Sequence, residues 1–157
     1  VLWAADKGIT SGVTDTLFAP NVSCTRAQMV TFLWRANGSP VVDYAMNFTD
    51  VPADAYYADA VRWAVSKGIT CGASATTFAP DMTVTRSQTV TFLYRAAGTP
   101  AVSGGSFADV DANAYYADAV AWAVAEGITS GTSATTFSPN APCTRAQIVT
   151  FMYRDAQ

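Results

Sequence analysis

Apolar residues recur at helical spacing in a segment that the chain carries three times. In the middle copy they run from Tyr57 to Val65 as a one-sided stripe, which predicts an amphipathic helix. Asp54, and Asn113 in the last copy, stand where an N-cap is expected. Gly68 follows the stripe, as a glycine in the left-handed conformation does at a helix end. A short first helix is therefore expected in each unit.

A second helix follows a polar connector that contains a glycine and a Phe-x-Pro sequence. Thr85 and Gln88 of the Thr-Arg-Ser-Gln sequence fit a capping box, in which each residue bonds the backbone N–H of the other. The first and last copies have Thr-Arg-Ala-Gln at the same place, beginning at Thr25 and Thr144. Each second helix is expected to run about ten residues, and Gly98 ends the middle one.

The chain thus consists of three helix–loop–helix repeats, which we number 1 to 3 and place at residues 1–40, 41–100 and 101–157. One repeat buries too little to fold alone, so we expect a mainly α, pseudo-threefold bundle with isolated bridges at most in the connectors. Repeat 1 lacks the thirteen or so residues that begin the other two. That gap predicts an apolar notch that another chain or a cleaved N-terminal piece could fill. A dimer made by segment exchange is then expected.

Composition narrows the function. Half of the 157 residues are hydrophobic, and the net charge is -3 without clustered Lys or Arg, so no nucleic-acid partner is expected. The chain has no histidine, which removes the commonest general base and zinc ligand. No apolar run is long enough for membrane insertion. No cofactor, no metal site and no enzyme activity are expected. Val1 opens directly into a helical pattern without a signal peptide, so the sequence reads as a mature piece.

The repeated phrases resemble the S-layer homology family. They are F-x-D-V-x(4)-Y-Y-x-x-A-V, then W-A-x-x-x-G-I-x-x-G, F-x-P and T-R-A-Q, and they cover nearly the whole chain. The resemblance implies three motifs in one bundle with grooves between them. It implies non-covalent binding to a secondary cell-wall polysaccharide, often pyruvylated, at an extracellular bacterial cell wall or S-layer. The family usually has T-R-A-E, so the glutamine here keeps the capping box and loses a charge.

The arginines of the tetrapeptides are the first candidates for ligand contact: Arg26, Arg86 and Arg145. They stand at the first helical position, where a cation opposes the helix dipole and capping does not need one. Beside free backbone N–H groups, a guanidinium makes a site for a carboxylate such as that of a pyruvate ketal. The alternative is an arginine tied to an internal acid, Asp50 or Asp109. Asp50 and Asp109 are also candidates for the ligand site, where they would orient the arginines, but a structural role such as capping a turn is favoured.

Other candidates have a structural explanation beside the functional one. Trp63 and Trp122 have the spacing of core residues, and an exposed indole edge could stack on a sugar. The glycines after Ile-Thr-x suit a backbone turn and also leave room for a sugar: Gly12, Gly72 and Gly131. One tyrosine of each Tyr-Tyr pair faces the core and its neighbour is a groove candidate. Cys24 and Cys143 occupy one repeat position, and whether they pair stays open.

The leading function is therefore a glycan-binding anchor for a larger surface protein. The alternative is an assembly module that self-associates or pairs with another chain. A site repeated three times favours binding over catalysis, because an active site is normally unique in a chain.

Overall fold

The computed structural model describes residues 1–105 and 107–157. Within them the secondary structure is helical, with four isolated β-bridges and no strands, so the predicted mainly α fold is confirmed. The helices are α1 (Leu2–Asp6), α2 (Arg26–Ala36), α3 (Ala58–Ser66), α4 (Arg86–Ala96), α5 (Ala117–Ala125) and α6 (Arg145–Asp155).

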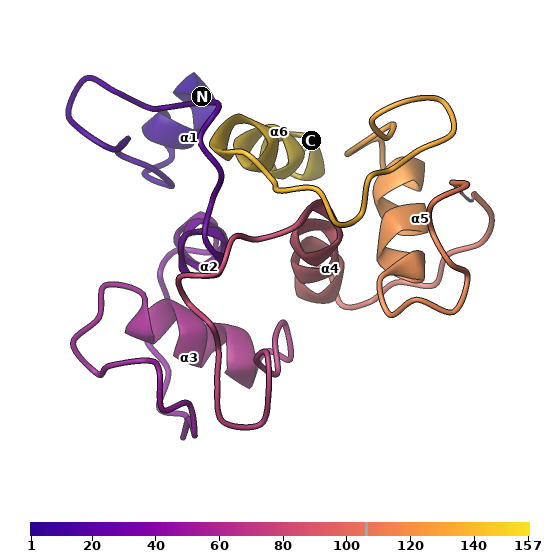
Figure 1. Cartoon of the computed structure of the whole chain (residues 1–157). Coiled ribbons are helices and arrows are strands. Elements are labelled where there is room, and N and C mark those ends of the chain that lie inside the picture. Colours follow the sequence, from indigo (N-terminus) through magenta and orange to yellow (C-terminus); the bar gives the residue numbers. More distant parts are fainter. Residues whose placement is uncertain (106) are drawn as a thin grey trace.

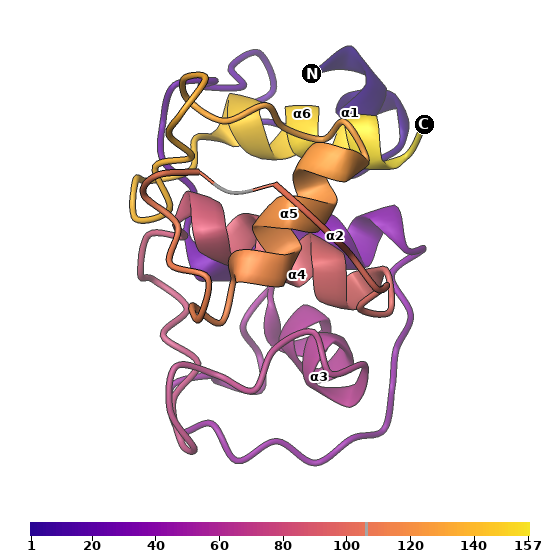
Figure 2. The ribbon, with the colours of Figure 1, turned by 90° about the vertical axis from the view of Figure 1, so that its right-hand side faces the viewer.

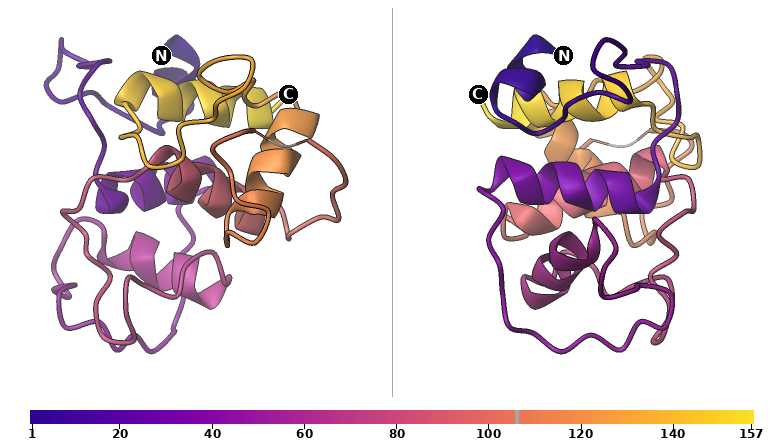
Figure 3. Two further views of the ribbon diagram at one scale, coloured as in Figure 1. Left: turned by 45° about the vertical axis from the view of Figure 1, so that its right-hand side comes forward. Right: turned by 90° about the vertical axis from the view of Figure 1, so that its left-hand side faces the viewer.

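The second helices of the three repeats form the centre of the molecule. Figure 1 shows α2, α4 and α6 grouped there, with the first helices and connectors around them as three arms. Figures 2 and 3 show the three central axes nearly parallel. Each first helix packs on the central helix of another repeat, α3 on α2, α5 on α4 and α1 on α6. The last of these pairs closes the circle and brings the two chain ends together (Figure 1).

The aromatic residues of the first helices hold these cross-repeat contacts. Trp122 of α5 packs against Tyr94 of α4, with ring centroids 5.6 Å apart. Trp3 of α1 makes the same contact with Tyr153 of α6 at 5.5 Å. Burial of such large rings contributes strongly to the core. Each repeat therefore depends on its neighbour for its apolar face, as the sequence predicted.

A ring of backbone hydrogen bonds marks the pseudo-threefold axis. The Cys24 N–H donates to Cys143 O at 3.0 Å, the Cys143 N–H to Val84 O at 2.9 Å, and the Val84 N–H to Cys24 O at 2.9 Å. All three residues are fully buried. The ring satisfies polar groups that would be costly to leave unpaired at the centre of the bundle.

The capping boxes are confirmed in all three central helices. In α4 the Gln88 N–H donates to Thr85 Oγ1 at 3.2 Å, and Gln88 Oε1 accepts from the Thr85 N–H at 3.1 Å. The predicted N-caps of the first helices are wrong. Helix α3 begins at Ala58 and α5 at Ala117, and neither has a side-chain cap.

A turn explains the later start of α3. The residues after Pro52 form successive turns, in which the Ala55 N–H donates to Pro52 O and the Ala58 N–H to Ala55 O. In repeat 3, the carboxylate of Asp111 accepts from the Asn113 N–H at 2.8 Å. Asp54 and Asn113 therefore lie in these turns, ahead of the helices that they were expected to cap.

The two cysteines at the axis are free thiols, as is Cys71. Burial raises the pKa of the Cys24 thiol to about 12, and it also raises the pKa of Cys143. Since the thiolate is the reactive form, both are expected to be inert in the folded protein, whereas Cys71 is exposed.

We expect titration of the native protein with a thiol-reactive disulfide dye to show one fast thiol, and titration in denaturant to show all three. Cys71→Ser should remove the fast reaction. Fast reaction of Cys24 or Cys143 in the native protein would contradict this expectation, and so would two missing thiols in denaturant, the sign of a disulfide.

Candidate functional site: three grooves between repeats

The arginine that begins each central helix is buried against the next repeat. Arg86 is 3% exposed, and its Nε donates to Phe137 O at 2.9 Å. Its guanidinium carbon lies 4.8 Å from the centre of the Phe137 ring and 5.5 Å from that of Phe151. The other two repeats repeat the arrangement: Arg26 with Phe78 and Phe92, and Arg145 with Phe18 and Phe32.

Burial is unfavourable to a cation, and it lowers the pKa of both Arg26 and Arg86. Carbonyl contact and cation–π contact offset part of this penalty. The Nη2 atom of Arg86 is buried and has no hydrogen-bond partner among the residues that the structure describes. In repeat 3, Arg145 Nη2 donates to Thr10 Oγ1 at 3.3 Å.

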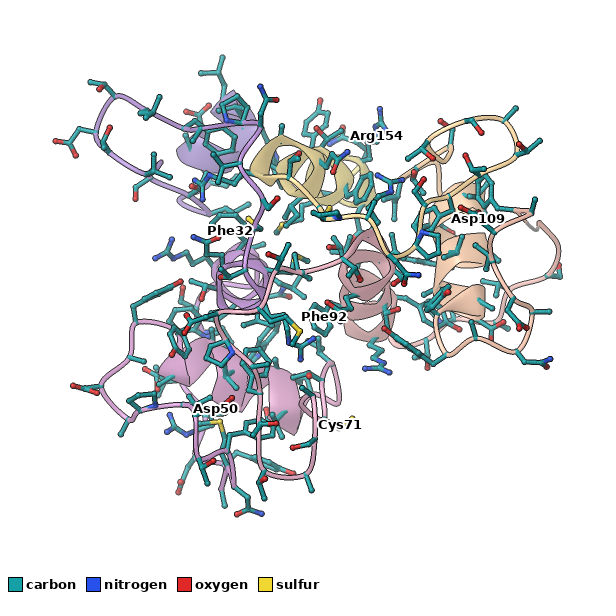
Figure 4. The ribbon with its side chains drawn as sticks, in the orientation of Figure 1. Phe32, Asp50, Cys71, Phe92, Asp109 and Arg154 are labelled. Atoms are coloured by element: carbon teal, nitrogen blue, oxygen red, sulfur yellow. The ribbon has the colours of Figure 1, made fainter. Side chains whose placement is uncertain are left out.

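The two predicted acids, Asp50 and Asp109, bind the backbone of the loop whose carbonyl accepts a hydrogen bond from the arginine. Asp50 accepts from the Phe78 and Ala79 N–H groups at 2.8 Å each, and Asp109 does the same for Phe137 and Ser138. Figure 4 shows both acids on the outer arms, beside α3 and α5. Among the described residues no ion pair joins them to an arginine, so direct pairing, one of the two alternatives, is wrong.

These loops hold strained backbone. Ala79 has φ of 58°, in the left-handed region that residues with a side chain rarely adopt, and it precedes a proline. Ala19 and Ser138 are equivalent to it, with φ of 55° and 59°. The bidentate carboxylate stabilises this conformation in repeats 2 and 3, and it thereby holds the phenylalanine carbonyl toward the arginine.

Acid is therefore expected to weaken the fold through Asp109. Hydrogen bonds from the backbone, first that of Phe137, hold its pKa below the ordinary value. A carboxyl with a lowered folded pKa contributes stability above the unfolded pKa, near 4, and loses it as the pH falls through the folded value. We expect Asp109→Asn to lower the Tm at pH 7 and to flatten its decrease between about pH 5 and pH 2, compared with Asp118→Asn on the surface of α5. Parallel curves for the two variants would contradict this.

The helix N-termini differ from expectation in one respect. The N–H of Arg86 donates to Ala141 O at 2.9 Å, and that of Ser87 donates to Pro139 O at 3.0 Å. With the capping box, the first N–H groups of α4 are all used, and α2 and α6 are bonded in the same way by their neighbours. The expectation of free backbone N–H groups beside the arginine is thus wrong, because the next repeat already occupies them.

A groove opens beside each arginine, and we name the grooves after these residues. Their volumes are about 370 Å³ for the Arg26 groove, 330 Å³ for the Arg86 groove and 260 Å³ for the Arg145 groove. The Arg26 groove is lined by Arg26, Thr70, Cys71, Gly72, Ala73, Met82, Gln88, Thr91, Phe92, Arg95 and Tyr115. The Arg86 groove is lined by Arg86, Thr129, Ser130, Gly131, Ala146, Gln147, Thr150, Phe151 and Arg154. The Arg145 groove is lined by Thr10, Ser11, Gly12, Gln28, Thr31, Phe32, Arg35, Tyr56 and Arg145.

Each groove contains a second arginine, near the end of a central helix, where the helix dipole also favours a positive charge. Arg95 lies in the last turn of α4, and its Nη1 donates to Ile69 O at 3.1 Å. Arg35 and Arg154 make the same bond in their repeats, and Figure 4 marks Arg154 on α6. The recurrence of arginine at this position in all three repeats could have indicated a role in the grooves, because a favourable charge at the helix end does not require arginine in every copy.

The predicted glycines line the grooves and are required by the backbone. Gly72 has φ of 94°, and a Cβ there would lie 2.7 Å from both Ser74 O and Thr77 O. Its N–H donates to Thr70 Oγ1 at 3.0 Å, which holds the connector against the groove. Gly12 and Gly131 have φ of 89°. A Cβ at Gly12 would lie 2.8 Å from both Thr14 O and Leu17 O, and one at Gly131 would lie 2.5 Å from Thr136 O.

The aromatic candidates fall into two groups, buried tryptophans in the core and exposed tyrosines at the grooves. Trp63 and Trp122 are each 4% exposed and belong to the core, and the structure does not bring them to the grooves. Tyr56 and Tyr115 are 62% and 64% exposed and stand at the Arg145 and Arg26 grooves. Their neighbours in the Tyr-Tyr pairs pack against the core, as expected.

Comparison with known proteins agrees with this architecture. Three segments, residues 1–30, 47–90 and 106–149, match the S-layer homology domain. The chain is 37% identical over 92 residues, 59% of its length, to the Surface-layer 125 kDa protein of Lysinibacillus sphaericus. Over 95% of its length it is 28% identical to an amylopullulanase of Thermoanaerobacterium thermosulfurigenes and 27% identical to the exoglucanase XynX of Acetivibrio thermocellus. It spans 8% of the first two relatives and 14% of the third.

The chain belongs to the S-layer homology domain family. S-layer homology domains are cell-wall-binding modules, and membership places the chain at the bacterial cell surface. In the part of the chain that the structure describes, no helix has the length and apolar character needed to cross a membrane.

Proposed function

We propose that this chain anchors a larger protein to the cell wall by holding acidic units of a secondary wall polysaccharide, such as pyruvylated N-acetylmannosamine, in its grooves. The observation that carries the proposal is the charge of the grooves. The chain has nine Lys and Arg residues and a net charge of -3, yet six of the nine are arginines placed two to each groove. No acidic side chain is among the described residues that line them.

The hydrogen-bond donors that remain on the guanidinium groups favour an anionic ligand. The Nε of each helix-initial arginine donates to a carbonyl, and Arg145 Nη2 also donates to Thr10 Oγ1. The remaining Nη donors are left for a planar partner. A carboxylate matches the fork of an arginine and forms short, charge-assisted hydrogen bonds. At Arg86, the buried Nη2 has no hydrogen-bond partner among the described residues, so one donor of this guanidinium is unused.

Size and lining suit a sugar. Volumes of 260 to 370 Å³ are at or just below the small end of the range for small-molecule sites. Threonine hydroxyls, such as those of Thr70 and Thr91 in the Arg26 groove, offer hydrogen bonds to sugar hydroxyl groups. The exposed ring of Tyr115 at that groove provides an aromatic surface for a pyranose face. Trp63 and Trp122 are core residues and do not line the grooves.

The repetition of the grooves and the nature of the relatives support a binding module rather than an enzyme. One constellation of arginine, glutamine, threonine and glycine recurs in three places, whereas catalysis is normally concentrated in one. The shared segment is a small part of relatives named for S-layer and glycan-degrading functions, which suits an anchor carried by different proteins. Self-association is the alternative if no glycan binds.

The test is isothermal titration of the chain with purified pyruvylated wall polysaccharide, and with the same polymer after reduction of its carboxyl groups to alcohols. We expect saturable binding that weakens with salt for the acidic polymer, and none for the reduced one. Equal binding to both polymers would contradict recognition of the acid by the arginines. Absence of binding to either would reject the glycan anchor, and light scattering would then examine self-association.

A further inference from the structure

A second cavity adjoins the Arg26 groove, against the linker that joins repeats 1 and 2. We name it the linker cavity, and its volume is about 580 Å³. Thr70, Cys71 and Arg95 line both the groove and this cavity. The two spaces therefore meet at these three residues, and a ligand in contact with Arg95 can occupy both.

The linker that forms the wall of this cavity is held at both ends. Trp34 Nε1 donates to Pro40 O at 2.8 Å, and the Thr49 N–H donates to Thr76 O at 2.9 Å. Between these two points, Met46 packs against the hydrophobic core. Because the wall is anchored chain, the cavity is formed before a ligand binds, and ordering it costs little binding energy.

Two residues of the linker give the cavity the character of a sugar site. Tyr44 is 46% exposed and provides an aromatic ring for a pyranose face. Asn47 is also exposed, and its amide has both donors and an acceptor for sugar hydroxyl groups. Arg95 is the one charged residue among the described residues that line the cavity. Since Arg95 already serves the acid in the groove, the cavity suits a neutral sugar unit.

These side chains distinguish the Arg26 groove from the Arg86 groove. Repeat 3 has Ser103-Gly104-Gly105 where repeat 2 has Tyr44-Ala45-Met46. Glycine has no side chain with which to form a wall, and serine has no aromatic ring. The linker beside the Arg86 groove therefore has no ring at the position of Tyr44.

We infer that the Arg26 groove and the linker cavity form one site for two consecutive sugar units, with the acidic unit in the groove and its neutral neighbour in the cavity. This inference rests on the proposed function for the class of ligand. The Nη1 of Arg95 donates to Ile69 O at 3.1 Å, which fixes the guanidinium where the two units meet. Tyr44 packs on the ring of the second unit, and Asn47 binds its hydroxyl groups. The Arg26 groove thus recognises the acid together with the unit next to it.

The test uses Cys71 as a reporter for this one site. Its thiol is exposed and lies on the arm that contains α3 (Figure 4), where it lines both the groove and the cavity. A bound saccharide should therefore slow its reaction with a thiol-reactive disulfide dye, and the half-protecting concentration measures affinity at the Arg26 groove alone. The probes are pyruvylated N-acetylmannosamine as a single unit, and the disaccharide in which it is joined to the next unit of the wall polysaccharide.

We expect the disaccharide to half-protect Cys71 at a roughly tenfold lower concentration than the single unit, as for one added aromatic contact with its hydrogen bonds. Tyr44→Ala should remove this difference by weakening only the disaccharide, with a nearly unchanged Tm because Tyr44 is exposed. Tyr56→Ala is the matched control, since it truncates an exposed tyrosine at the Arg145 groove, and it should keep the difference.

Equal protection by the two probes, or a difference that survives in Tyr44→Ala, would overturn the inference and leave the proposed function standing. Binding of the polymer in the titration without any protection of Cys71 would do the same. Failure of the polymer to bind, together with failure of both probes to protect, would overturn the inference and the proposed function.

Discussion

Arg86→Lys will remove one of the sites for a pyruvylated saccharide, with affinity in that groove falling about a hundredfold or more. Lysine keeps the charge, but it has no planar group to lie between Phe137 and Phe151 while donating both to a carbonyl and to a ligand. The other two grooves keep their arginines, so the stoichiometry measured by titration should decrease by one. The corresponding triple variant, with Arg26 and Arg145 also replaced, should not bind.

Folding has to be separated from binding in this experiment, because Arg86 is buried. Arg154→Lys provides the separation, since Arg154 lines the same groove on an exposed part of α6. It should weaken the same site about tenfold while the Tm is nearly unchanged. Arg62→Lys, on the surface of α3, is the matched control. A full set of sites in Arg86→Lys would show that this arginine serves only the contact between repeats.

Phe78→Ala and Phe137→Ala will each destabilise the protein by about 3–5 kcal/mol, the usual cost of truncating a fully buried phenylalanine. Both rings are fully buried, and each contacts a guanidinium and a second phenylalanine, Phe48 for Phe78 and Phe107 for Phe137. Truncation therefore removes core volume and leaves an arginine without its cation–π partner. Urea unfolding followed by circular dichroism measures the change.

Repeat 1 supplies the control for this prediction. Phe18 occupies the same position beneath Arg145, but it is only partly buried, and the Phe48 equivalent does not fall within the sequence. Phe18→Ala should therefore cost distinctly less than the other two truncations. An equal loss at all three positions would mean that contact with the guanidinium, rather than burial, dominates the energy.

Local patterns were sufficient for the parts of the fold that depend on neighbours in sequence. Each capping box needs only residues three apart, and the left-handed glycine after the first helix follows from one turn of chain. The mainly α fold follows from the repeated apolar stripe. The prediction of N-caps at Asp54 and Asn113 was wrong, although it too depended only on neighbours in sequence. Polar residues before a stripe suit a turn as well as a cap, and the turns after Pro52 and Asp111 delay the helices.

The site was harder to predict because its partners come from different repeats. The sequence places an arginine at the start of each central helix, but nothing near Arg86 in the chain indicates that Phe137 O, 51 residues away, receives its Nε. The roles of Arg95 and of the tyrosines depend in the same way on how the repeats close into a circle. Free N–H groups were expected because one helix was considered alone, whereas the bundle uses them between repeats.

Residues from three repeats meet in a single groove. The Arg26 groove takes its arginine from repeat 1, its connector and helix face from repeat 2 and Tyr115 from repeat 3, and the Arg145 groove is shared in the same way. A lone repeat, copied into another protein, would carry fragments of several sites and no whole one. In gene duplication and in protein engineering, the unit that can be moved with its binding sites intact is therefore the set of all three repeats. Deleting any one repeat should remove recognition at every groove to which that repeat contributes.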